Sequence, residues 1–166
     1  MYKWRLGGIY KDNSSIKLED IKGKKVLITC DQGLGDTILF SRFLKLLLDL
    51  KTDVTLAVTE AMVDLMECID SRIKIISATD NIMKYDYNFS LGDLINIFKL
   101  QERNIPKYKN YINISKKYIN KWSKKIDKQK FNIGVVWQGK KNTIIDEGRS
   151  IKLKYFENIS KIHNVQ

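Results

Sequence analysis

The sequence predicts an α/β fold built around a doubly wound, mainly parallel sheet. Short apolar runs rich in β-branched residues alternate along the chain with longer segments that have one apolar face. The apolar runs are nearly continuous, as in strands covered on both faces, and a pair of glycines follows the first of them. Alternating strands and helices form parallel βαβ units with right-handed crossovers, and such units build a doubly wound sheet.

Length and composition suit a globular domain. The chain has 166 residues, of which 43% are hydrophobic. We predict a lead-in segment at residues 1–22 and one domain at residues 23–166. No segment approaches the roughly 18 apolar residues of a membrane span, and the N-terminus lacks the apolar core of a signal peptide. A cytoplasmic location is therefore expected.

Charge and cysteine content exclude some classes of protein. Two cysteines and a single histidine, His163, argue against a disulfide framework and against a zinc site. The formal net charge of +11 comes almost entirely from lysine. It fits either a solvated basic surface or an anionic partner, and we favour the solvated surface. No helix-turn-helix, RNP or zinc-finger pattern supports nucleic-acid binding.

The first two thirds of the chain contain four predicted strands. Residues 24–30 form the first, because valine, leucine and isoleucine follow a lysine-rich turn. Thr59 is placed to cap a helix, and Pro106 ends another. After the first strand, the predicted elements are a helix at 37–50, a strand at 54–58, a helix at 60–69, strands at 73–76 and 85–89, and a helix at 91–100.

The remainder of the chain begins with a basic amphipathic helix at residues 115–127, which carries Tyr118, Ile119 and Trp122 on one side. Residues 131–137 are a continuous apolar run and are predicted to form another buried strand. A final helix is predicted from residue 153 to about residue 162.

The first candidate functional loop is Gly33-Leu34-Gly35-Asp36. Its glycines allow a sharp turn and a close approach of ligand to backbone, and free amides at the start of the next helix favour an anion. The loop is not a complete dinucleotide-binding fingerprint, because Ile38 stands where the third glycine belongs. A tight turn capped by Asp36 is the alternative interpretation.

Two charged side chains belong to this loop and the helix after it. Asp36 can accept a proton from a hydroxyl, or it can simply stabilise the helix dipole. Arg42 can form a surface ion pair, for instance with Asp36, or reach an anionic ligand. The tripeptide Leu91-Gly92-Asp93 echoes the loop, but its surroundings differ and we predict no internal repeat.

The second loop runs from Trp137 through Gly139 to Arg149. Trp137 can stack on a sugar ring or close the core. Arg149 can bind a phosphate or carboxylate with two parallel hydrogen bonds. We expect this loop and the Asp36 loop to border one crevice at the carboxyl edge of the sheet.

These motifs together resemble the opening of heptosyltransferase-like glycosyltransferases, in the variety often found behind tetratricopeptide repeats. The resemblance rests on Trp4, on the first strand and loop with Phe40 and Arg42, and on residues 134–139 and 146–151. The order and spacing of the motifs agree over nearly the whole chain.

The resemblance implies a fold of the GT-B type, in which two Rossmann-like domains face a cleft. The N-terminal domain chiefly receives the acceptor, and the C-terminal domain chiefly holds the nucleotide-sugar donor. This chain corresponds to the acceptor side, so we expect it to be incomplete as a catalyst. Its expected partners are a nucleotide sugar, a glycan or protein hydroxyl acceptor, and the donor-binding domain; no metal or other cofactor is expected.

The implied reaction is inverting sugar transfer, in which an acceptor hydroxyl attacks the anomeric carbon and the nucleoside diphosphate leaves. Asp36 matches the family's aspartate after the glycine loop and is the expected general base. A non-catalytic module that binds carbohydrate or protein is the alternative function. The expected substrate-binding residues are Gln32, Gly33, Leu34, Gly35, Thr37, Arg42, Trp137, Gly139, Asp146, Arg149 and Ser150.

Overall fold

The computed structural model describes residues 16–30, 33–80, 84–139 and 150–166. The chain divides into two compact units, Met1–Ile114 and Ser115–Gln166, each with its own internal packing. Within the described ranges, no helix is long and apolar enough to cross a membrane.

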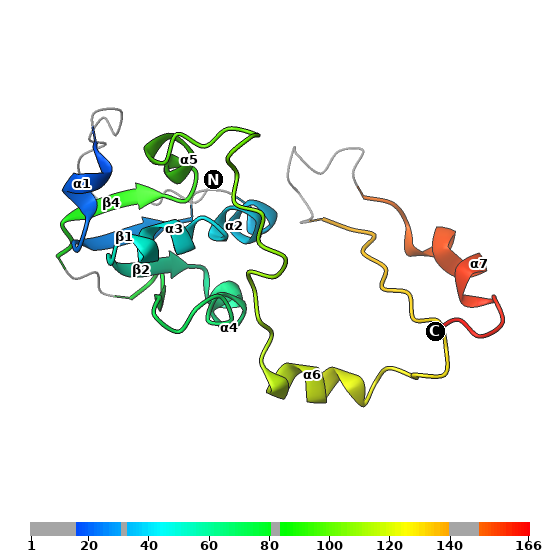
Figure 1. Ribbon diagram of the computed structural model, residues 1–166. Coiled ribbons are helices and arrows are strands. Elements are labelled where there is room, and N and C mark those ends of the chain that lie inside the picture. The colour runs from blue at the N-terminus through cyan, green and yellow to red at the C-terminus, as the bar shows by residue number, and fades with distance from the viewer. Residues whose placement is uncertain (1–15, 31–32, 81–83, 140–149) are drawn as a thin grey trace. The chain divides into compact units, whose positions relative to one another are not determined.

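The described part of the first unit contains a four-stranded sheet in which every pair of neighbouring strands is parallel (Figure 1). The order across the sheet is β3-β2-β1-β4, so β1 and β2 are the inner strands. The prediction of an α/β chain with a parallel sheet is confirmed. The strands are β1 (Lys25–Thr29), β2 (Asp53–Val58), β3 (Lys74–Ser77) and β4 (Tyr87–Ser90).

The inner strands are buried on both faces, as their continuous apolar sequences predict. Val26, Leu27 and Ile28 are successive residues of β1, and all three side chains are buried. Because successive side chains of a strand point to opposite faces, both faces of the sheet must be covered here. Ile21, which precedes β1, is also completely buried in the main core cluster. Each such side chain stabilises the fold by about 1.5–3 kcal/mol relative to an exposed one.

Short helices surround this sheet. The helix predicted over residues 37–50 is wrong as a single element, because the structure divides it into α2 and α3. The helices of the first unit are α1 (Leu18–Ile21), α2 (Leu34–Ser41), α3 (Leu44–Asp49), the 3-10 helix η2 (Glu60–Met62), α4 (Val63–Met66) and α5 (Asp93–Ile97).

The break between α2 and α3 has a local cause. The Ser41 hydroxyl donates to the Ile38 carbonyl at 2.8 Å, and Arg42 Nε donates to the Leu39 carbonyl at 2.9 Å. These side chains compete for carbonyls that backbone N–H groups of a continuing α-helix would use. The backbone N–H of Phe43 bonds a carbonyl only three residues earlier, at 2.9 Å, which tightens the turn.

The second unit has little regular structure among its described residues. The strand predicted over residues 131–137 is wrong: a single parallel bridge joins Phe131 to Val165. The backbone N–H of Ile133 still donates to the carbonyl of Gln166 at 2.9 Å. Beyond that point the apolar run has no strand beside it among the described residues, and Val136 is 91% exposed. The helices of this unit are α6 (Lys116–Ser123), the 3-10 helix η4 (Leu153–Phe156) and α7 (Glu157–Ser160).

Candidate functional site

The strand order creates a topological switch point between β1 and β4. From β1 the chain moves outward through β2 to β3, and it then returns to place β4 on the other side of β1. In open α/β sheets, ligands bind beyond the carboxyl ends of the strands at the point where the direction of winding reverses. The segments that follow β1 and β4 are therefore the strongest candidates for a binding site.

Two turns with the same tripeptide lie at this switch point. Thr29 at the end of β1 is in register with Ser90 at the end of β4, and the backbone N–H of Leu91 donates to the Thr29 carbonyl at 3.0 Å. The sequence Leu-Gly-Asp follows at Leu34–Asp36 after β1 and at Leu91–Asp93 after β4. The tripeptide begins five residues after the end of β1 but directly after the end of β4, so the two copies follow paired strands without occupying equivalent positions.

Asp36 has the capping role that the sequence left open, and its role as a base stays a prediction. One carboxylate oxygen, Oδ2, accepts a hydrogen bond from the backbone N–H of Gly33 at 3.2 Å, so the side chain caps the start of α2. The Asp36 side chain is also exposed to solvent. The carboxylate is therefore held in place and accessible to a ligand at the same time.

Capping by itself does not distinguish Asp36 from other acids at this edge. The Ser90 N–H donates to Asp93 Oδ2 at 2.8 Å, and the Ser77 N–H at the end of β3 donates to Asp80 Oδ2 at 2.9 Å. The ends of β3 and β4 therefore carry the same kind of capping contact as the start of α2. What separates the Asp36 turn from the other two is its pair of glycines, Gly33 and Gly35.

Gly35 contributes open space to the Asp36 turn. A Cβ atom at this position would meet no described heavy atom within 4 Å, and the backbone does not have the positive φ that requires glycine. Alanine would stabilise a helix interior by roughly 1 kcal/mol relative to glycine. No contact within the described residues explains the glycine, and a ligand lying against the backbone would.

The two leucines of the repeated tripeptide differ in burial. Leu34 is 57% exposed, whereas Leu91 is 1% exposed and belongs to the core. Thr37, the next predicted ligand residue, is buried, and its hydroxyl donates to the Gly33 carbonyl at 3.1 Å. Leu34 therefore presents an apolar surface at the site, while Thr37 holds the turn.

Arg42 does not pair with Asp36 in the described part of the chain. Its guanidinium lies 4.9 Å from the centre of the Tyr111 ring, and its Nε donates to the Leu39 carbonyl. These contacts fasten the segment before residue 115 to the end of α2. The role of Arg42 in anion binding stays a prediction.

The second predicted loop is partly described. The Ile151 N–H donates to the Trp137 carbonyl at 3.0 Å, and the Gly139 N–H donates to Ser150 Oγ at 2.9 Å. Trp137 and Gly139 also line a shallow pocket of about 440 Å³. The structure thus brings three predicted residues together in the second unit.

Other predictions fall outside the described residues. Gln32, Asp146 and Arg149 belong to this group. The crevice that Asp36 and Arg149 are predicted to share therefore stays a prediction.

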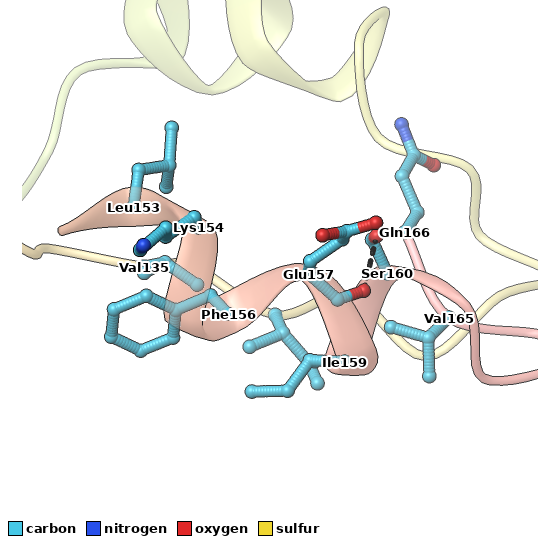
Figure 2. Close-up of a pocket in the computed structure, with 10 residues that line it drawn as sticks. Val135, Leu153, Lys154, Phe156, Glu157, Ile159, Ser160, Val165 and Gln166 are labelled. Atoms are coloured by element: carbon cyan, nitrogen blue, oxygen red, sulfur yellow. Dashed lines mark hydrogen bonds between the residues drawn. The ribbon is translucent and has the colours of Figure 1, made fainter.

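An apolar groove of about 510 Å³ lies elsewhere in the second unit, between residues 133–135 and the last helices. Figure 2 shows Val135, Phe156, Ile159 and Val165 along it, with the Ser160 hydroxyl donating to the Glu157 carbonyl at 2.7 Å. None of the predicted site residues lines this groove.

The strongest shift of a side-chain pKa among the described residues is that of Asp70, at the amino ends of the parallel strands. A hydrogen bond from Arg72 lowers the pKa of Asp70 to about 2, and Arg72 Nη2 lies 2.8 Å from Asp70 Oδ2. This turn precedes β3, at the amino ends of the parallel strands, so it is a structural ion pair. Within the described ranges, no group of three histidine, cysteine or acidic side chains is placed to hold a metal ion.

Comparison with known proteins adds no family. No protein-family model, curated protein or solved structure matches the chain.

Proposed function

We propose that the Asp36 turn is a binding site for a hydroxyl-bearing ligand at the switch point of a Rossmann-like domain. More particularly, we propose that the chain is the acceptor-side domain of an inverting glycosyltransferase of the GT-B type. The supporting observation is the turn itself: an exposed carboxylate, a glycine with open space beside it, and a position after β1, the strand that pairs with β4.

The proposed chemistry needs one base at the acceptor. Asp36 takes the proton from the acceptor hydroxyl as its oxygen attacks the anomeric carbon of the donor sugar. A new glycosidic bond forms at that carbon, and the nucleoside diphosphate leaves with the electrons of the broken bond. Attack from the side opposite the leaving group inverts the anomeric configuration.

The capping hydrogen bond supports this role for Asp36. The hydrogen bond from the Gly33 N–H limits the rotation of the carboxylate. A base that is already oriented loses less entropy when the reacting groups meet. Backbone amides at the start of α2 would add positive field near the departing phosphates.

The nucleotide sugar is assigned to a second domain in this proposal. This division of substrates can be tested with the chain alone, because the Asp36 turn should bind the acceptor and should not bind the nucleotide sugar. Backbone amide NMR during titration with methyl glycosides and oligosaccharides should shift the signals of Gly33, Gly35 and Asp36. UDP-, ADP- and GDP-linked sugars should leave these signals nearly unchanged.

Two outcomes would redirect the assignment. Tight nucleotide-sugar binding at the Asp36 turn would contradict the division between acceptor and donor domains. Saccharide binding at the turn without any transfer by the complete two-domain enzyme would instead favour the non-catalytic carbohydrate-binding module.

A further inference from the structure

Helix α6 presents apolar side chains to solvent. Ile119 and Trp122 lie one turn apart and are 54% and 53% exposed. Ile114 and Ile126 flank the helix and are exposed as well. Exposed isoleucine and tryptophan on one short segment are unfavourable in water, which makes a covering surface the expected state of this face.

Lysines surround this apolar face. Residues 115–130 contain seven lysines and one acid, Asp127, for a formal charge of +6. Among the described residues, none of these lysines forms an ion pair with an acidic side chain. Lys125 Nζ instead lies 4.9 Å from the centre of the Trp122 ring. The lysines are Lys116, Lys117, Lys121, Lys124, Lys125, Lys128 and Lys130.

We propose that α6 and its flanks bind the surface of an anionic lipid bilayer. The apolar side chains would enter the boundary between headgroups and acyl chains, and the lysine ammonium groups would lie among the phosphates. Tryptophan favours this depth because its ring is apolar and its N–H is polar. Each lysine near an anionic leaflet adds a favourable electrostatic term, so seven of them compensate for the shortness of the helix.

Nucleic acid is the competing polyanion, and the apolar side chains argue against it. Phosphate backbones attract lysine equally well, but they offer no apolar surface to cover Ile114, Ile119 and Ile126. The segment also contains no arginine, the residue that binds phosphate or guanine with two parallel hydrogen bonds. This inference does not depend on the proposed sugar transfer.

Vesicle co-sedimentation of the full chain tests the proposal. Phosphatidylcholine vesicles that contain phosphatidylglycerol should retain the protein, and vesicles of phosphatidylcholine alone should not. The double variant Lys121→Glu/Lys124→Glu should bind the anionic vesicles at least 10-fold more weakly. Its matched control is Lys24→Glu/Lys74→Glu, which makes the same charge change at exposed lysines of the first unit and should bind nearly as well as the wild type.

The apolar contribution is tested separately. Ile119→Ser/Trp122→Ser should weaken anionic-vesicle binding by 10-fold or more without any change in charge. In a Trp4→Phe/Trp137→Phe background, the fluorescence of Trp122 should shift to shorter wavelength when anionic vesicles are added. Circular dichroism of each variant, with thermal unfolding, checks that the fold is kept.

Several results would overturn the inference. They are equal binding to neutral and anionic vesicles, unchanged Trp122 fluorescence in the presence of vesicles, and a loss of vesicle binding in Lys24→Glu/Lys74→Glu as large as that in Lys121→Glu/Lys124→Glu. Tight, steeply salt-dependent binding of a single-stranded RNA oligomer without vesicle binding would assign the lysines to nucleic acid instead.

Discussion

Asp36 Oδ2 accepts a hydrogen bond from the backbone N–H of Gly33, with 3.2 Å between the oxygen and the nitrogen. This contact closes the turn after the inner strand β1 and leaves the carboxylate exposed at the carboxyl edge of the sheet. Asp93 makes a contact of the same kind at the end of the neighbouring strand β4, where it accepts a hydrogen bond from the Ser90 N–H. The chain therefore carries an internal control for the role of Asp36.

Asp36→Asn should separate capping from catalysis. The asparagine carbonyl can still accept the Gly33 N–H, so the free energy of unfolding should change by less than about 1 kcal/mol. Asparagine cannot take a proton from an acceptor, so turnover by the proposed two-domain transferase should fall by ~10²-fold or more. Stability by denaturant titration and product formation by chromatography are the two measurements.

Asp93→Asn is the matched control for this change. It changes the acid that caps the end of β4, and turnover by the proposed transferase should stay within a few-fold of the wild type. Unchanged turnover in Asp36→Asn would exclude Asp36 as the base. An equal loss of turnover in both variants would show that the loss comes from weakened caps and not from a missing base.

Gly35→Ala should preserve the fold and block the site. The new methyl group meets no described atom within 4 Å, and alanine is the better helix former, so stability should rise by up to about 1 kcal/mol. Saccharide-induced NMR shifts at the turn should disappear if a ligand lies against this backbone. In the control Gly92→Ala, the Cβ would lie 3.7 Å from Ser90 Oγ, an ordinary contact, and saccharide binding should persist.

Gly23→Ala should destabilise the first unit. Gly23 has a φ of +68°, a conformation that costs an alanine roughly 1 kcal/mol. No described atom lies within 4 Å of the position that the alanine Cβ would take, so the backbone alone is responsible for the loss. Urea unfolding should show a lower midpoint with an unchanged slope. Gly134→Ala, where φ is not positive and space is also open, should change stability little.

Arg72→Gln should raise the pKa of Asp70 from about 2 toward the ordinary value near 4, because the hydrogen bond and charge that hold it down are removed. A depressed native pKa stabilises the folded state above the unfolded pKa, and the stabilisation is lost as pH falls through about 2. The variant should therefore be less stable than wild type at neutral pH and nearly equal to it near pH 2.

Side-chain carboxyl NMR through an acid titration measures this pKa directly. Arg103→Gln removes an exposed arginine elsewhere and should leave Asp70 unchanged. An Asp70 pKa that stays near 2 in Arg72→Gln would show that the hydrogen bond is not its cause.

The sequence predicts the sheet well because its inner strands are buried on both faces. Val26 to Ile28 and Val54 to Val58 are continuous apolar runs except for Thr55, so their pattern alone identifies them. The run at residues 131–137 is also mostly apolar but lies beside only one bridged partner residue among those described. Strand formation depends on a neighbour, and composition does not report whether one is present.

Helix breaks and pairings between distant strands are harder to predict from the sequence. The division of residues 34–49 into two helices follows from side-chain hydrogen bonds of Ser41 and Arg42 that periodicity does not reveal. The Asp36 turn is predictable from its glycines. The placement of β4 beside β1 depends on a pairing between distant segments, which no local pattern encodes.

That pairing has a consequence for the order in which the molecule folds. Val26 pairs with Val54 on one side, 28 positions along the chain, and with Tyr87 on the other, 61 positions along. Closing the longer segment costs more entropy, so β4 should join after β1 and β2 have met. The switch point exists only once β4 has joined, so recovery of ligand binding during refolding would mark the last step of sheet formation.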